Sequence, residues 1–131
     1  MTIKWTPFLR SYIETALWSS TDDEGVPLDS AKYADAKLAD ETLEQMSKDC
    51  EQFQTEYAKL ARDLDDSVLR SFPPDSQIPH DFWLTRNHHG AGFWDGDYPK
   101  AIGQALTELA HSFGECDLYV GDDGKIHLYP A

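Results

Sequence analysis

The sequence has little positive charge. Eleven lysines and arginines stand against 24 aspartates and glutamates, which gives a formal net charge of −13. Such an excess repels phosphate backbones and anionic lipids wherever salt does not screen it. We therefore expect no direct binding to nucleic acid and none to a membrane surface. A protein partner with a basic surface fits the charge better.

Long apolar runs and cysteine motifs are also missing. No apolar run approaches the roughly 20 residues of a membrane-spanning helix, and residues 1–10 lack the basic start and apolar core of a signal peptide. The two cysteines, Cys50 and Cys116, belong to no CxxC motif. Two buried thiols are the simplest interpretation, with a disulfide or a metal pair as the alternatives. These features predict a cytoplasmic protein.

Catalytic signatures are absent from the sequence as well. No serine has the glycine neighbours of a nucleophile elbow, and no HExxH or HxH spacing occurs. Gly90-Ala91-Gly92 lacks the later glycine of a phosphate-binding loop. The sequence therefore predicts no catalytic residues, no nucleotide chemistry and no cofactor.

What remains is the composition of one globular domain. The 131 residues are 40% hydrophobic and 12% aromatic, enough for a single core. We expect one domain over residues 1–131, with a helical half at 1–72 and a mixed half at 73–131. The predicted fold class is α+β: an acidic N-terminal helical hairpin packed with a C-terminal ββαββ unit whose sheet is small and antiparallel.

Two helices are predicted in the first half. Thr6 and Pro7 are an N-cap and a first helical residue, and the apolar face that follows predicts a helix to about Trp18. A second helix should begin at Asp29 or Ser30 and end at Asp65-Asp66, and a break near Asp40 would divide it into two. Its apolar positions recur at steps of three and four, and we call them the helical seam. They are Ala36, Ala39, Leu43, Met46, Cys50, Phe53, Tyr57, Leu60 and Leu64.

The second half has shorter patterns. Aromatic runs at 82–86 and 92–95, joined by residues 87–91, predict a β-hairpin. Tyr98-Pro99 should open a helix that ends at Gly114. Residues 115–120 and 125–129 alternate as strands across the turn sequence Gly121–Gly124.

Unusual chemistry is concentrated around the first predicted hairpin. We expect a contact surface there, with Trp83 and Trp94 as a cross-strand pair and Arg86 as an anion ligand or a surface ion-pair partner. The alternative is a metal-dependent hydrolase, because imidazole and carboxylate ligands bind divalent ions that ionise water. The surface comprises Trp83, Arg86, Asn87, His88, His89, Trp94 and Asp95. The metal ligands would be His80, His89, Asp95 and Asp97.

The second candidate site is the acidic face of the long predicted helix. Carboxylates spaced along a helix can imitate a nucleic-acid backbone and occupy a basic groove on another protein. A solvated helix face is the simpler interpretation of the same pattern. The residues are Asp40, Glu41, Glu44, Asp49, Glu51, Glu56 and Asp63.

Two runs carry a resemblance. HDFWLTRNHHGAGFWDGD at 80–97 and FGECDLYVGDDGKI at 113–126 resemble a family of small bacteriophage and prophage proteins, with a DFWLTRNGHGAGFWD-like core and a C-terminal GDDG hairpin. The match covers about residues 78–125. It implies a phage origin and adds no catalytic role. His88 stands where the family core has glycine, in a turn that favours glycine.

These observations lead to one main hypothesis and two alternatives. The main hypothesis is a phage-encoded acidic interaction protein in the host cytoplasm, an inhibitor or nucleic-acid mimic that acts on a host defence or nucleic-acid-processing protein. The alternatives are the metal-dependent hydrolase and a homodimeric scaffold or docking protein that shares its helical seam.

Overall fold

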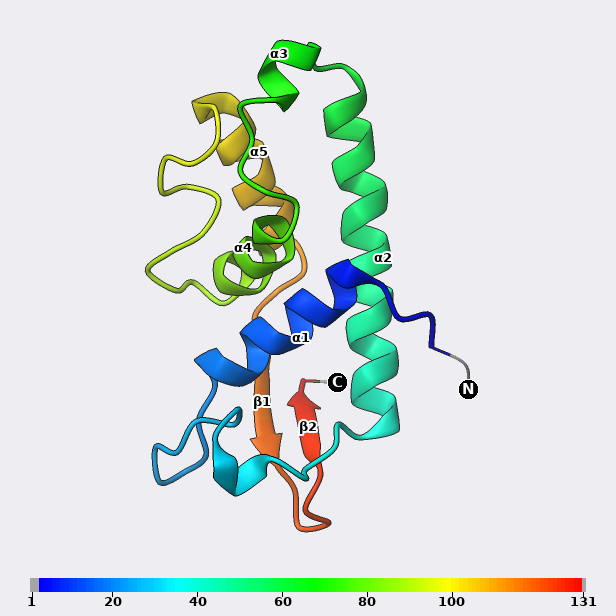
Figure 1. Cartoon of the computed structure of the whole chain (residues 1–131), viewed down its shortest axis with the longest axis vertical. Coiled ribbons are helices and arrows are strands. Elements are labelled where there is room, and N and C mark those ends of the chain that lie inside the picture. Colours follow the sequence, from blue (N-terminus) through cyan, green and yellow to red (C-terminus); the bar gives the residue numbers. More distant parts are fainter. Residues whose placement is uncertain (1–2, 131) are drawn as a thin grey trace.

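The structure, a computed structural model, describes residues 3–130; residues 1, 2 and 131 of the expected domain lie outside the described residues. Five α-helices, one 3₁₀ turn and two strands follow one another within that range (Figure 1). They are α1 (Pro7–Ser19), η1 (Ala31–Tyr33), α2 (Asp40–Arg62), α3 (Asp66–Leu69), α4 (Gln77–Arg86), α5 (Lys100–His111), β1 (Asp117–Val120) and β2 (Ile126–Tyr129).

The fold class is α+β, as predicted. β1 and β2 form a two-stranded antiparallel sheet in which Asp117 pairs with Tyr129 and Val120 with Ile126. Gly124, in the turn between the strands, has φ 77°, a conformation that side chains disfavour. The C-terminal hairpin of the prediction is therefore confirmed.

The helices with clear end signals also agree with prediction. The Thr6 hydroxyl accepts a hydrogen bond from the Leu9 amide at 3.1 Å, and Pro7 begins α1. Pro99 precedes the first residue of α5, and Gly114 follows that helix with φ 78°. Proline before a helix and glycine after it are the signals on which these two predictions depended.

The long helix begins later than Asp29 or Ser30. The chain forms η1, then enters α2 at Asp40, and α2 ends at Arg62. A division near Asp40 is confirmed, although the first piece is a 3₁₀ turn rather than an α-helix. Within α2 the predicted seam is buried at Met46, Cys50 and Phe53.

The first predicted hairpin is wrong, and with it the ββαββ unit. Residues 77–86 form α4, and residues 87–99 are an irregular segment. Residues 81–86 are buried without interruption, so almost every side of this helix faces protein. A helix buried all round has no polar face, and its sequence therefore lacks the helical period.

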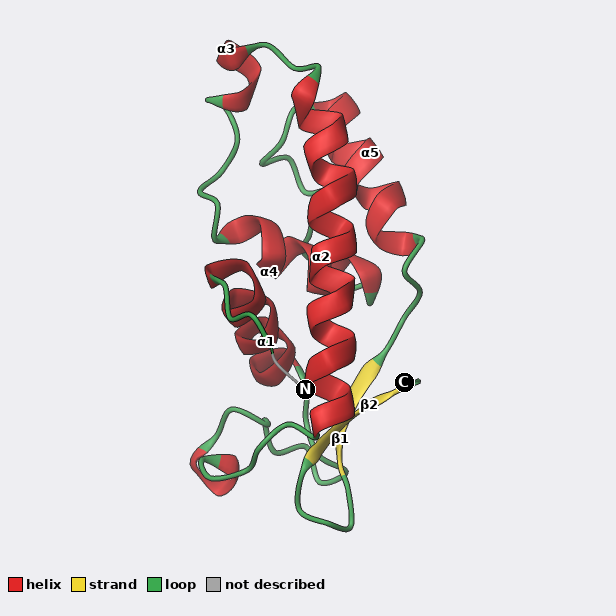
Figure 2. Cartoon of the chain, turned by 90° about the vertical axis from the view of Figure 1, so that its right-hand side faces the viewer, coloured by secondary structure: helices red, strands yellow, loops and turns green. Residues whose placement is uncertain are grey.

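The N-terminal helical hairpin is not formed either. α1 packs mainly against α4, whereas the longer α2 runs most of the length of the molecule (Figures 1 and 2). Tyr12 of α1 stacks on Phe82 at 5.0 Å between ring centroids and meets Trp83 edge-on at 5.4 Å. The large apolar side chains of α4 thus occupy the face of α1 that was expected to lie along the second helix.

An aromatic cluster joins the helices. Phe53 of α2 stacks on Phe82 at 4.2 Å and on Phe93 at 5.8 Å. Rings at these separations attract one another beyond simple burial. Within residues 3–130, no helix is both long and apolar enough to cross a membrane.

Candidate binding groove

Arg86 is an internal residue rather than a surface ligand. Its side chain is almost fully buried, and Nη1 donates to Asp49 Oδ2 and to the Tyr12 hydroxyl, both at 2.9 Å. Nε and Nη2 donate to the backbone carbonyls of Gly114 and Phe113 at 2.9 and 3.0 Å. The prediction of an anion ligand or a surface ion pair is wrong. Arg86 instead joins α1, α2, α4 and the end of α5.

Asp49 is also an internal residue and does not belong to the exposed acidic face of α2. It is buried on α2, accepts from Arg86, and also accepts from Gln45 Nε2 at 2.9 Å. A signal for this was present in the sequence: Asp49 lies three residues after Met46 and four before Phe53, on the buried stripe of the helix. The stripe was a better guide than the charge.

The other candidate residues of α2 are partly paired with bases. Glu44 lies 3.7 Å from Lys48, Glu56 lies 3.0 Å from Lys59, and Asp63, just past the helix, lies 3.6 Å from Arg62. Asp40, Glu41 and Glu51 are exposed. The helix face therefore carries both signs of charge.

Trp83 and Trp94 do not form a pair. Trp83 is 1% exposed, and its indole N–H donates to the Ser19 hydroxyl at 2.9 Å. Trp94 is 56% exposed, on the segment that follows α4. Because residues 77–86 are helical, the cross-strand geometry that would unite the two rings does not exist.

The turn that ends α4 is formed by Asn87, His88 and His89. The His89 amide donates to the Leu84 carbonyl at 2.9 Å and the His88 amide to the Thr85 carbonyl at 3.1 Å. His88 has φ 56°. This is the helix ending that usually has glycine at the second residue past the helix, so the expectation of a turn that favours glycine is confirmed.

The segment after this turn is packed tightly onto α4. A methyl group on Gly92, which has φ 155°, would lie 2.2 Å from Thr85 Oγ1. The Thr85 hydroxyl accepts from the Phe93 amide at 3.0 Å, and the Asp95 carboxylate accepts from the Gly92 amide at 3.3 Å. Gly92 and Asp95 thus shape this segment.

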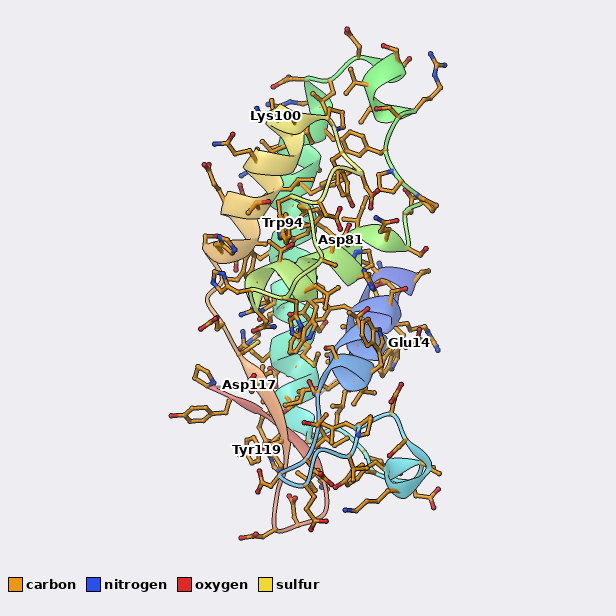
Figure 3. All side chains as sticks on the ribbon, turned by 90° about the vertical axis from the view of Figure 1, so that its left-hand side faces the viewer. Glu14, Asp81, Trp94, Lys100, Asp117 and Tyr119 are labelled. Carbon is orange, nitrogen blue, oxygen red and sulfur yellow. The ribbon has the colours of Figure 1, made fainter. Side chains whose placement is uncertain are left out.

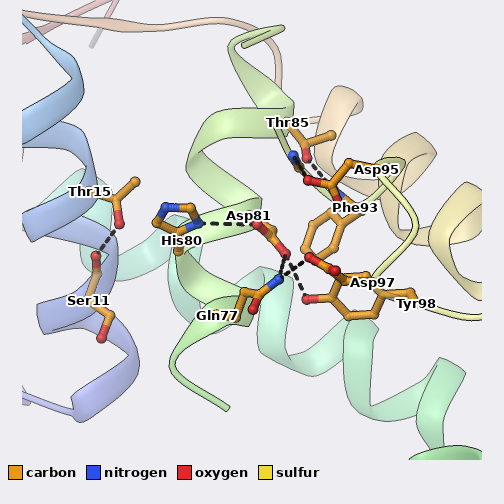
Figure 4. A network of polar contacts seen from close by, with 11 residues as sticks. Ser11, Thr15, Gln77, His80, Asp81, Thr85, Phe93, Asp95, Asp97 and Tyr98 are labelled. Carbon is orange, nitrogen blue, oxygen red and sulfur yellow. Dashed lines mark hydrogen bonds and ion pairs between the residues drawn. The ribbon is translucent and has the colours of Figure 1, made fainter. Parts of the chain in front are cut away.

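The four proposed metal ligands are separated into different contacts. His80 Nδ1 lies 3.2 Å from Asp81 Oδ1, and Asp97 accepts from Gln77 Nε2 at 2.7 Å (Figure 4). Asp95 serves the turn just described, and His89 lines a groove on another side of α4. Nowhere in residues 3–130 do three His, Cys, Asp or Glu side chains gather as a metal site requires. The metal alternative gains no support from the geometry.

Asp81 is the buried acid of this region. Tyr98 donates to its Oδ2 at 3.0 Å, and Gln77 Nε2 lies 3.3 Å from the same oxygen (Figure 4). Burial raises the pKa of the Asp81 carboxyl, against the lowering effect of its bonds to His80, Tyr98 and Gln77. Tyr98 belongs to the 87–99 segment, so its bond to Asp81 secures that segment against α4.

Both cysteines are free and buried. Burial raises the pKa of the Cys116 thiol to about 11 and raises that of Cys50 as well. Thiolates are therefore scarce at neutral pH, and the interpretation of two buried thiols is confirmed.

A groove of about 690 Å³ lies along β1, and we call it the β1 groove. In Figure 1 the strand lies between β2 on one side and the loop that follows α1 on the other. Acidic side chains line it from both walls. Its lining residues are Ser19–Glu24, Lys32, Tyr33, Trp83, Asn87, His89 and Asp117–Val120.

Asp22 holds the outer wall of the β1 groove in shape. Its carboxylate accepts from the amides of Glu24 and Val26, both at 2.9 Å, and from the Tyr33 hydroxyl. Lys32 Nζ lies 3.0 Å from it. These bonds, with that of Tyr33 first, lower the pKa of Asp22. Asp22 and Lys32 therefore satisfy each other, and the charges of Asp23 and Glu24 remain.

The opposite wall carries aromatic surface as well as charge. Asp117 and Tyr119 alternate with Leu118 and Val120, so they lie on the face of the sheet away from the core. Figure 3 labels both on β1, well separated from Trp94. Tyr119 is 46% exposed and stacks on His127 of β2 at 5.4 Å.

The β1 groove was not predicted as a site, although three of its residues were assigned to the predicted hairpin surface: Trp83, Asn87 and His89. The available signal was the strongly acidic stretch 21–24 beside a glycine and a proline. Nothing in the sequence indicated that β1, almost 100 residues later, forms the facing wall. Comparisons with protein-family models, curated proteins and solved structures find no match for this chain.

Proposed function

We propose that this chain is a small acidic binding protein that holds a basic surface of another protein in its β1 groove. In the phage setting suggested by the sequence resemblance, the partner is a host defence or nucleic-acid-processing protein in the host cytoplasm. Binding inhibits it by covering a basic surface that otherwise meets nucleic acid. No chemistry by the chain itself is required.

One observation carries this proposal: the β1 groove is a concave space whose acidic charge is not neutralised from within. Asp23, Glu24 and Asp117 line it and are exposed. Within residues 3–130, the carboxylates of Asp23 and Glu24 have neither an ion-pair nor a hydrogen-bond partner. Lysine and arginine side chains of a partner would supply the missing charge, and complementary charge raises the rate of encounter.

The α2 face supports the proposal less strongly. Its carboxylates were the residues expected to imitate nucleic acid, but Asp49 is internal and three others lie beside Lys48, Lys59 and Arg62. An exposed row of both signs attracts a basic groove weakly. We therefore assign the principal contact to the β1 groove and keep Asp40, Glu41 and Glu51 as a second acidic patch.

The homodimer alternative would need a different surface. Met46, Cys50 and Phe53 of the proposed shared seam are already buried within one chain. Phe53 stacks on the chain's own Phe82 and Phe93. Sharing the seam between two copies would first require these helices to separate.

The test uses two variants that remove the same two negative charges from different places. Asp23→Asn with Glu24→Gln neutralises the groove, and Glu41→Gln with Glu51→Gln neutralises the α2 face. Immobilised wild-type and variant proteins are exposed to bacterial extract at low and high salt, and each captured protein is then purified and titrated directly.

The expected result is a partner of high isoelectric point whose affinity falls with salt. The groove variant should bind it at least tenfold more weakly, because two charge contacts are lost, whereas the α2 variant should stay within about threefold of wild type. Equal loss in both variants, or greater loss in the α2 variant, overturns the assignment to the β1 groove.

A further inference from the structure

The backbone of β1 has one edge engaged by β2. In an antiparallel pair, alternate residues turn their N–H and C=O toward the partner strand. The Gly121 amide donates to the Lys125 carbonyl at 2.8 Å, so Gly121 is turned toward β2. Tyr119 and Asp117 are turned the same way. The polar groups of Leu118 and Val120 therefore point out of the sheet at the other edge.

The pairing of Ile126 confirms this orientation independently. Its amide donates to the Lys37 carbonyl, and its carbonyl accepts from the Ala39 amide, both at 2.9 Å. The N–H and C=O of Ile126 therefore point away from β1. Val120 pairs with Ile126, so its own N–H and C=O point away from β2. The same bonds show that the outer edge of β2 is closed. Leu128 closes it further, since its amide donates to Thr42 Oγ1 at 2.9 Å.

The outer edge of β1 is closed at one end and open along the rest. The Cys116 amide, which belongs to the same outward row, donates to Asn87 Oδ1 at 2.8 Å. For Leu118 and Val120, no protein group in residues 3–130 bonds to the outward N–H or C=O. Both residues line the β1 groove. Two donors and two acceptors thus point toward a groove of about 690 Å³. Leu118 is 4% exposed and Val120 is half-buried, so the groups of Val120 are the more accessible pair.

An extended chain is the occupant that can bond to all four groups at once. An open strand edge pairs with another strand through backbone hydrogen bonds, and side chains at alternate positions add specificity. In such a chain, every second side chain would lie on the face of Asp117 and Tyr119. A lysine or arginine there pairs with the Asp117 carboxylate and lies against the Tyr119 ring.

We propose that the open edge of β1 binds an extended, basic segment of a partner protein as a third strand of the sheet. The inference rests on the proposed function and specifies the mode of binding. The favoured segment alternates lysine or arginine with β-branched residues, since the latter lie beside Val120 and suit a strand. The acidic wall from Asp22 to Glu24 then lies along its other side.

The experiment compares three synthetic peptides of eight residues that alternate lysine and valine. The first is unmodified, the second is N-methylated on the lysine amides, and the third is N-methylated on the valine amides. Only one set of amides can face β1. One methylated peptide should therefore bind at least tenfold more weakly than the unmodified peptide, and the other should bind within about threefold of it. Fluorescence anisotropy with the full-length chain measures the affinities.

A matched pair of variants tests the protein side. Val120→Pro removes the outward backbone amide, which β2 does not use. Val120→Thr keeps this amide and replaces the side chain with one of similar shape. The proline variant should lose about tenfold in affinity for the unmodified peptide, and the threonine variant should not. If Val120→Pro fails to fold, amide resonances of the wild-type protein answer the same question: those of Leu118 and Val120 should shift and become protected from exchange on binding.

The outcomes separate this inference from the proposed function. Equal binding of all three peptides, with loss in the Asp23→Asn, Glu24→Gln variant, overturns strand addition and leaves the acidic groove as a binding site. No binding of any peptide below about 1 mM also overturns strand addition, while the captured partner decides the proposed function. Loss through one methylated set and through Val120→Pro supports the third strand.

Discussion

The charge of Arg86 is buried and paired, whereas the acidic charges of Asp23 and Glu24 in the β1 groove are exposed and unpaired within the part of the chain that the structure describes. Arg86 is buried, and Asp49, Tyr12 and two backbone carbonyls accept from its guanidinium. The groove instead holds Asp23 and Glu24 in solvent, together with backbone groups of β1 that have no protein partner. Both regions are rich in polar atoms, yet one is complete and the other is open. We interpret the complete set around Arg86 as structural, and the proposed binding depends on the open set in the groove.

The difference predicts where substitutions affect folding and where they affect binding. Leaving a buried charge without its partner costs several kilocalories per mole, because water cannot replace the lost bond. Removing an exposed charge costs little, because water already solvates it. The predictions that follow test this contrast.

Arg86→Met should have the largest effect. It leaves the Asp49 carboxylate buried without its cation, and we expect the free energy of unfolding to fall by about 3–5 kcal/mol. Urea denaturation followed by circular dichroism measures this. Arg70→Met, at an exposed arginine, is the control and should change the free energy by less than about 0.5 kcal/mol. A similar small change for Arg86→Met would show that the pair is not needed for folding.

Gly92→Ala should be the next most harmful. The new methyl would overlap Thr85 Oγ1, and the backbone at φ 155° disfavours any side chain. We expect a loss of about 1–3 kcal/mol, measured as above. Gly90→Ala is the matched control in the same segment, since a methyl there meets nothing within 4 Å. Equal effects at the two glycines would contradict the close packing of this segment on α4.

Asp81→Asn tests the buried acid through pH. Because the pKa of Asp81 is raised in the folded protein, the folded state binds the carboxyl proton of Asp81 more tightly than the unfolded chain does. The protonated Asp81 carboxyl contributes fully to the free energy of unfolding below pH 3.8, the ordinary pKa of an aspartate. This contribution is lost as the pH rises through the raised pKa. The variant should therefore gain stability relative to wild type across that window.

Urea denaturation at a series of pH values measures the difference between the two proteins. Tyr98→Phe sharpens the test, because it removes a hydrogen bond that lowers the pKa of Asp81. It should move the window to higher pH. A difference that shrinks as pH rises would show that the carboxyl is favoured in its charged form.

The groove variant Asp23→Asn, Glu24→Gln should have the smallest effect on folding. Both residues are exposed, so we expect the free energy of unfolding to change by less than about 0.5 kcal/mol in either direction. The midpoint of thermal unfolding and urea denaturation both measure it. A loss as large as that of Gly92→Ala would mean that these acids hold the loop in place, and the contrast between the two regions would then fail.

The parts of the fold that sequence reasoning predicted are those with local signals. Thr6 and Pro7 mark the start of α1, Pro99 and Gly114 bracket α5, and the Gly121–Gly124 turn defines the hairpin of β1 and β2. In each case the residues that determine the element are adjacent in the chain. The α4 helix lacked such a signal, because burial on nearly all sides removed its polar face.

The surface placement predicted for Arg86 and Asp49 was wrong for a related reason. Arg86 and Asp49 are 37 residues apart in the sequence, and charge alone suggests the surface for both. Their contact depends on how α2 and α4 cross, which no local pattern encodes. The β1 groove likewise joins residues 19–24 to residues 117–120, so only the folded chain brings its walls together. His88 is the exception, since its left-handed conformation follows from one helix ending.

Trp83 gives the molecule an optical reporter at this site. Its indole is 1% exposed and lines the β1 groove, whereas Trp5, Trp18 and Trp94 are each about half exposed, at 49%, 48% and 56%. Exposed indoles are quenched by dissolved acrylamide or iodide, and an enclosed indole is protected from them. The emission that survives quenching therefore comes mainly from one ring, whose bond to Ser19 lies at the wall of the groove. We expect this emission to change when the proposed partner fills the groove, so binding can be followed without a label.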